Sequence, residues 1–119
     1  MSKTLRAFTL IEIMIVVLII GILLAIAVPN FIRAREQSRA KSCSANLKQI
    51  DAAKEQYAMD QKKNAGDAVA DFSVLVGTSL YLKATPACPS GGTYTIAGVS
   101  TDPTCTKTSS AYPHTVNGQ

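Results

Sequence analysis

Few side chains in this 119-residue chain are placed to do chemistry, and the most unusual of them is an acid beside an apolar run. Glu12 directly precedes residues 13–28, none of which carries a polar side chain. An unpaired carboxylate in a lipid-embedded segment costs about 3 kcal/mol on insertion scales, so Glu12 needs a partner. The other candidates are three cysteines, one histidine and three C-terminal acids: Cys43, Cys88, Cys105, His114, Asp67, Asp71 and Asp102.

The three cysteines leave their pairing open. If the C-terminal half is exported, an oxidising compartment favours one disulfide. We expect Cys88 to pair with Cys105, because closing the turn-rich loop between them contributes about 3 kcal/mol. A bridge from Cys43 to either one is the alternative. The CxxC spacing of zinc sites is absent and His114 falls in a polar tail, so we expect neither a metal site nor a cofactor.

No arrangement of these residues predicts an enzyme. Asp67, Asp71 and Asp102 offer the oxygen ligands that calcium prefers, but their spacing is loose, and we interpret them as solvated loop acids. Neither a Ser/His/Asp nor a Cys/His pattern is present. The function is therefore more readily inferred from the N-terminal segment.

A long helix must position Glu12. Residues 8–28 span about 31 Å as a helix, which matches the hydrocarbon core of a bilayer. Gly21 and Pro29 are the expected kink positions. Residues 30–64 lack Gly and Pro and continue the helix, which should stop near residues 64–66. This part has one apolar face, interrupted by Lys54 and formed by Ala40, Cys43, Leu47, Ile50 and Tyr57.

Residues 65–119 predict a small head. Residues 71–76 form a short helix or turn with Phe72 and Leu75 inward, and residues 93–96 and 104–108 form two strands. The predicted fold class is α+β: a long N-terminal helix, apolar and transmembrane in its first half and amphipathic in its second, with a small β-containing head.

The net charge of +4 is unevenly distributed. Residues 30–64 hold eight basic against four acidic side chains, whereas residues 65–119 have a net charge of −1. The basic excess would lie beside lipid headgroups. We therefore expect no direct nucleic-acid binding by the head.

The stretch RAFTLIE, residues 6–12, resembles the class III signal of type IV pilins and type II secretion pseudopilins. In that family a prepilin peptidase removes a basic leader, and the new N-terminal residue is methylated. The resemblance implies a leader at residues 1–7, cleavage between Ala7 and Phe8, and N-methylation of Phe8. Ala7 stands where the family usually has glycine. The remaining segments are then a transmembrane and filament-core helix, an amphipathic helix and a head: 8–29, 30–64 and 65–119.

The same resemblance supplies a partner for Glu12. In the family, the glutamate of an incoming subunit pairs with the N-terminal amine of a neighbour, here Phe8, and this pair sets the stagger between subunits. Two paired charges share the lipid cost that each would bear alone. Thr9 either lines the same contact or bonds back to its own backbone.

The resemblance implies a structural subunit of a homo-oligomeric type IV pilus-like filament, assembled by an inner-membrane platform and ATPase. The subunit would span the inner membrane once before it joins a surface filament. Alternatives are a type II secretion pseudopilin in a periplasmic pseudopilus and a competence-type DNA-uptake pilus subunit. An ordinary secretory signal is a further alternative, because Ala25-Ile-Ala27 is an A-x-A site and cleavage there would release a soluble chain from Val28.

Overall fold

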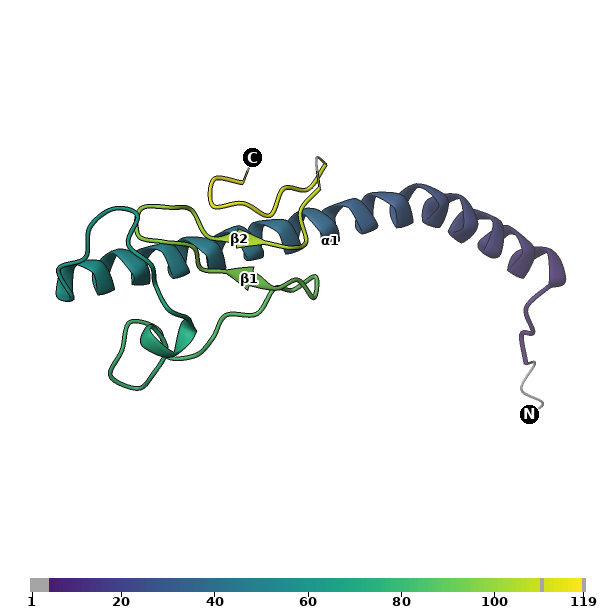
Figure 1. Ribbon diagram of the computed structural model, residues 1–119. Coiled ribbons are helices and arrows are strands. Elements are labelled where there is room, and N and C mark those ends of the chain that lie inside the picture. The colour runs from purple at the N-terminus through teal and green to yellow at the C-terminus, as the bar shows by residue number, and fades with distance from the viewer. Residues whose placement is uncertain (1–4, 110, 119) are drawn as a thin grey trace. The chain divides into compact units, whose positions relative to one another are not determined.

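The computed structural model describes residues 5–109 and 111–118. The elements in chain order are α1 (Leu10–Asp60), the 3-10 helix η1 (Phe72–Val74), β1 (Tyr94–Thr95) and β2 (Thr104–Cys105) (Figure 1). The predicted α+β fold is confirmed. The chain divides into two compact units, Met1–Arg35 and Glu36–Gln119, which are described separately.

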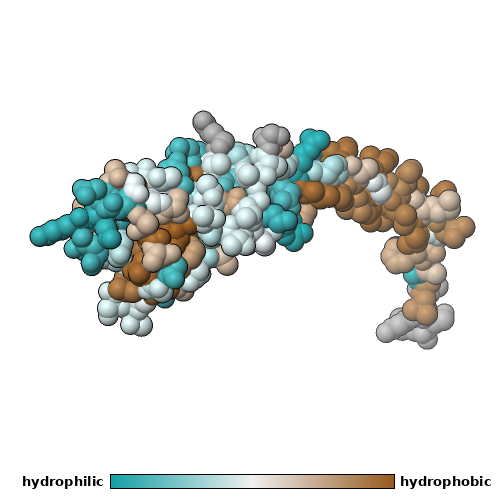
Figure 2. Space-filling model, viewed as in Figure 1, coloured by the Kyte–Doolittle hydropathy of each residue, from teal (hydrophilic) through white to brown (hydrophobic). Residues whose placement is uncertain are grey.

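The N-terminal unit is the apolar half of α1. Its large hydrophobic side chains from Leu10 to Ile32 are each between 49% and 81% exposed, and they form the brown surface in Figure 2. The helix is long and apolar enough there to cross a membrane. It runs without a break through Gly21 and Pro29, and a kink at these residues stays a prediction. A helix that is apolar all round needs lipid or other protein around it.

The C-terminal unit packs its head against one face of α1. Buried positions follow each other at steps of three and four, as predicted: Ala40, Cys43, Ser44, Leu47, Ile50, Ala53, Lys54 and Ala58. Leu47 and Ile50 share a core with Leu75, Tyr94 and Ile96 of the head. The interpretation that Lys54 interrupts this face was wrong, because its side chain is fully buried.

The C-terminus of α1 lies earlier than predicted, at Asp60 instead of residues 64–66. Lys62 adopts φ 52°, and the N–H of Lys63 donates to the carbonyl of Ala58 at 2.8 Å. These are features of a Schellman motif, with lysine at the left-handed position that glycine usually occupies. The sequence-based boundary was misplaced because it relied on a glycine.

The head holds a two-stranded antiparallel sheet, with Tyr94 opposite Cys105 and Thr95 opposite Thr104. Both predicted strands exist, but each is two residues long. Ala97 has φ 61°, which turns the chain away soon after β1. The short helix predicted over residues 71–76 is present as η1.

Candidate functional site

The first turn of α1 is closed by Thr9 and Glu12. The hydroxyl of Thr9 accepts from the N–H of Glu12 at 3.3 Å, and the carboxylate of Glu12 accepts from the N–H of Thr9 at 3.2 Å. This reciprocal pair is a capping box, which satisfies two backbone donors that the helix start leaves free. The T-x-x-E spacing signals this motif in the sequence, although our sequence interpretation used only the charge of Glu12.

The charge of Glu12 is not neutralised by the capping box. Across residues 5–109 and 111–118, the ion pairs are Arg39 with Glu36 and Lys54 with Asp51, so the carboxylate of Glu12 faces no cation of the described chain. Phe8 is 82% exposed beside it. Of the predicted leader, residues 1–4 lie outside the described residues. The processing role of Ala7 and Phe8 remains a prediction.

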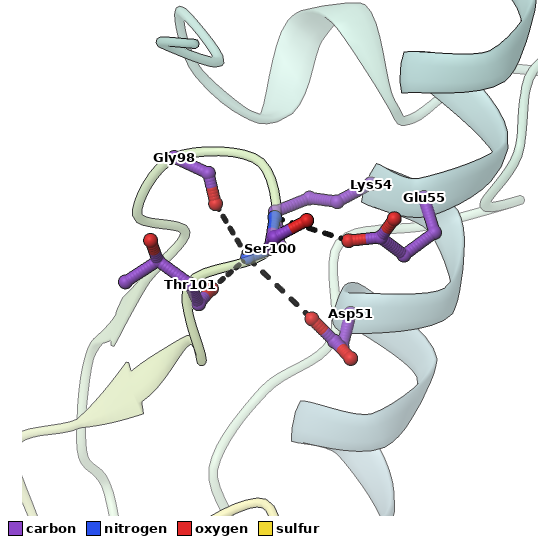
Figure 3. A network of polar contacts seen from close by, with 6 residues as sticks. All are labelled: Asp51, Lys54, Glu55, Gly98, Ser100 and Thr101. Carbon is purple, nitrogen blue, oxygen red and sulfur yellow. Dashed lines mark hydrogen bonds and ion pairs between the residues drawn. The ribbon is translucent and has the colours of Figure 1, made fainter. Parts of the chain in front are cut away.

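Lys54 links α1 to the loop that follows β1 (Figure 3). Its ammonium donates to the carbonyl of Gly98 at 3.1 Å and to the carbonyl of Thr101, and lies 3.6 Å from Asp51. On the same helix, Glu55 accepts from the N–H of Ser100 at 3.1 Å. Two carbonyls and a carboxylate replace the water that a buried ammonium would otherwise lose.

All three cysteines meet the histidine inside the head. The ligand atoms of Cys43, Cys88, Cys105 and His114 lie within 4.8 Å of one another, and all four residues are buried. The sulfurs of Cys88 and Cys105 are 3.6 Å apart, and the Cys88 sulfur lies 3.8 Å from His114 Nδ1. The placement of His114 in a polar tail was therefore wrong, since its exposed fraction is 5%.

The thiols differ in their surroundings. Burial raises the pKa of Cys43 to about 12. Burial also raises the pKa of Cys88, but the N–H groups of Gly92 and Ser90 point at its sulfur and bring the pKa below its usual value. The three thiols are free, so the predicted Cys88–Cys105 disulfide is not shown and stays a prediction.

The predicted loop acids do not gather into a ligand group within the part of the chain that the structure describes. Asp71 caps η1 by accepting from the N–H of Ser73 at 2.7 Å, and this contact lowers the pKa of Asp71. Asp67 accepts from the N–H of Asn64 at 2.7 Å. Two of the three acids thus serve the local backbone.

Gly92 permits the close packing around the cysteines. A Cβ at this position would lie 2.8 Å from the Cys105 sulfur and 2.9 Å from Lys107 Cγ. We expect Gly92→Ala to destabilise the head by about 1–3 kcal/mol, the usual cost of overpacking. The measurement is the thermal midpoint of the purified chain. Gly21→Ala is the matched control, because its Cβ would meet nothing within 4 Å; equal midpoints for both variants would contradict the packing argument.

Comparison with known proteins places the N-terminal segment among motifs for N-terminal modification. Residues 3–28 match the family model of the prokaryotic N-terminal methylation motif. The chain is 33% identical over 100 residues to the type IV wide pilus major component PilA4 of Thermus thermophilus, covering 84% of this chain and 70% of that protein. No solved structure matches the chain significantly.

Two further relatives match mainly through the N-terminal part. The type IV major pilin protein PilA of Myxococcus xanthus is 43% identical over 72 residues, which are 60% of this chain and 30% of that protein. The type II secretion system core protein G of Pseudomonas aeruginosa is 43% identical over 53 residues, 44% of this chain and 37% of that protein. The chain thus spans about a third of the length of these two relatives.

Proposed function

The chain belongs to the type IV pilin and pseudopilin family, and on that premise we propose that it is a building subunit of a type IV pilus-like filament. It is a structural protein and not an enzyme. In the proposal, a prepilin peptidase removes residues 1–7, Phe8 is methylated, and an inner-membrane platform with its ATPase moves the subunit from the membrane into a surface filament. Residues 8–29, 30–64 and 65–119 are then filament core, amphipathic helix and head.

The observation that carries this proposal is the exposed apolar half of α1. Side chains from Leu10 to Ile32 lie open on all sides of the helix. Such a segment is stable in a bilayer of about 30 Å and equally in a bundle of identical helices. Lipid already removes this surface from water, so transfer into the filament gains little hydrophobic energy and needs an external motor.

Glu12 supplies the register in this proposal. Cleavage before Phe8 creates an α-amine that is cationic at neutral pH, and N-methylation retains that charge. The carboxylate of Glu12 has satisfied its own helix start and still carries an uncompensated charge. Pairing it with the Phe8 amine of a neighbouring subunit removes two isolated charges at once and selects one stagger.

A pilus subunit is favoured over a secretion pseudopilin by the reach of the similarity. The match to the Thermus pilus component covers 84% of this chain and extends into the head, whereas the match to secretion protein G covers 44%. Direct DNA binding by the head is disfavoured by its net charge of −1 over residues 65–119.

Substitutions at Ala7 test the cleavage step. We expect Ala7→Gly to be cut at least as fast as the natural chain, and Ala7→Glu to stay uncut, because a small side chain must fit the peptidase pocket beside the scissile bond. Intact mass of the membrane-bound chain reports loss of the seven-residue leader. Equal cutting of all three chains, or loss of the leader at another bond, would contradict the proposed site.

A further inference from the structure

The Cys/His cluster brings together residues that are far apart in the sequence. Cys43 lies on α1, Cys88 precedes a turn, Cys105 ends β2, and His114 lies near the C-terminus. Their exposed fractions are 0%, 8%, 7% and 5%. Three sulfurs and one imidazole nitrogen therefore converge in the interior of the head, beside the α1 face that carries it.

We propose that Cys43, Cys88, Cys105 and His114 form a structural Cys3His site for one Zn²⁺ ion. This inference goes beyond the filament function and replaces our expectation that the chain holds no metal. The four ligand atoms lie within 4.8 Å of one another, which satisfies the requirement that one ion reach all of them.

The distances agree with tetrahedral zinc. Bonds of about 2.3 Å to sulfur and about 2.0 Å to nitrogen place two sulfur ligands about 3.8 Å apart and a sulfur and a nitrogen about 3.5 Å apart. The two measured separations are 3.6 Å between Cys88 and Cys105 and 3.8 Å between Cys88 and His114 Nδ1. The ligands thus need shifts of only a few tenths of an ångström at these contacts.

The donor set selects the ion. Three thiolates and one imidazole suit zinc, whereas calcium and magnesium require oxygen ligands. Binding converts three S–H groups into three Zn–S bonds and releases three protons to water, and zinc keeps its charge, so no oxidant is needed. A disulfide would require an oxidant and would leave the third thiol and the imidazole buried without a ligand.

Groups around the cluster fit the charge of such a site. Three thiolates with Zn²⁺ carry a net charge of −1, which needs hydrogen-bond donors nearby. The N–H groups of Ser90 and Gly92 point at the Cys88 sulfur, and the Tyr94 hydroxyl contacts the Cys43 sulfur. Asn46 holds that hydroxyl by donating to it at 3.1 Å. Gly92 lets its backbone approach because a side chain there would meet the Cys105 sulfur.

The site would also explain how so small a head holds together. Its sheet has two residues in each strand, and small domains with little regular structure often depend on a metal or a disulfide. A zinc ion bound to α1, the turn, β2 and the C-terminal segment would join all four. Binding energy at a site absent from the unfolded chain adds directly to folding stability.

The test is metal analysis of the full chain, purified in detergent from membranes without added oxidant. We expect about one zinc per chain, and after exchange a Co²⁺ spectrum with tetrahedral ligand-field bands and a sulfur-to-cobalt charge-transfer band. His114→Ala and Cys43→Ser should each lower zinc affinity more than about tenfold, since even outer partners matter by that factor. Asp102→Asn, a change at an acid outside the cluster, is the matched control and should keep one zinc.

Removal of zinc from the natural chain by a chelator keeps the test informative if a variant fails to fold. The thermal midpoint should fall on chelation and return when zinc alone is added back. Two results would overturn the proposal: a folded, reduced chain that binds neither zinc nor tetrahedral cobalt, or a chain from native membranes in which two of the cysteines form a disulfide. Neither result would bear on filament assembly, which is measured separately.

Discussion

Glu12→Gln is expected to leave the chain processed and anchored in the membrane while its incorporation into filaments falls about a hundredfold or more. Breaking a buried ion pair by removing one partner costs about 3–5 kcal/mol, which corresponds to that factor. Glutamine is the sharpest substitution here because it removes the charge and keeps the capping box, which accepts Glu or Gln at this position. The measurement is the ratio of the subunit in sheared surface filaments to that in membranes.

Thr9→Ala is the matched control for the helix cap. It removes the hydroxyl that accepts from the Glu12 N–H at 3.3 Å but leaves the carboxylate in place. Loss of an N-cap costs about 1 kcal/mol of helix stability, so filament incorporation should stay close to that of the natural chain. The opposite pattern, with Glu12→Gln assembling normally and Thr9→Ala failing, would show that Glu12 serves the cap and not the register.

The N-terminal half could be predicted closely from the sequence because one physical requirement dominates it. A run of apolar residues ending near Pro29 has few alternatives to a membrane-length helix, and Glu12 is conspicuous beside it. The capping box was missed because attention to the charge of Glu12 hid its spacing from Thr9. The helix end was misplaced because Lys62 takes the left-handed conformation without being glycine.

Lys54→Met is expected to destabilise the head by about 2–4 kcal/mol. Methionine fills much of the same volume, but it leaves the carbonyls of Gly98 and Thr101 without the ammonium that they now accept from. Each buried acceptor left unpaired costs about 1–3 kcal/mol. For a unit of this size such a loss lowers the thermal midpoint by roughly 10 °C or more. Thermal unfolding followed by circular dichroism of the purified chain measures it.

Lys48→Met provides the matched control for this experiment. Lys48 lies on the same helix and is exposed, so the same substitution there should change the midpoint little. Replacement of a buried charge by a hydrophobic residue is sometimes neutral or stabilising. An unchanged or raised midpoint for Lys54→Met would therefore mean that the loop carbonyls find water and that Lys54 does not hold the loop.

The head was predicted less completely because its interior depends on contacts between distant segments. The step of three and four residues identified the buried face of α1, but residue type alone made Lys54 look like an interruption. Its burial depends on two carbonyls more than forty residues away. His114 and the cysteines follow the same rule, since no local spacing brings residues 43, 88, 105 and 114 together.

The most direct test of the filament proposal is the N-terminal sequence and intact mass of the chain, taken from sheared surface material and from membranes. The account predicts a chain in the sheared fraction that starts at N-methylated Phe8. The same species confined to membranes would contradict the surface filament and favour a pseudopilin. A chain that starts at Val28 would mean a soluble secreted protein, and the proposed role of Glu12 would then be wrong.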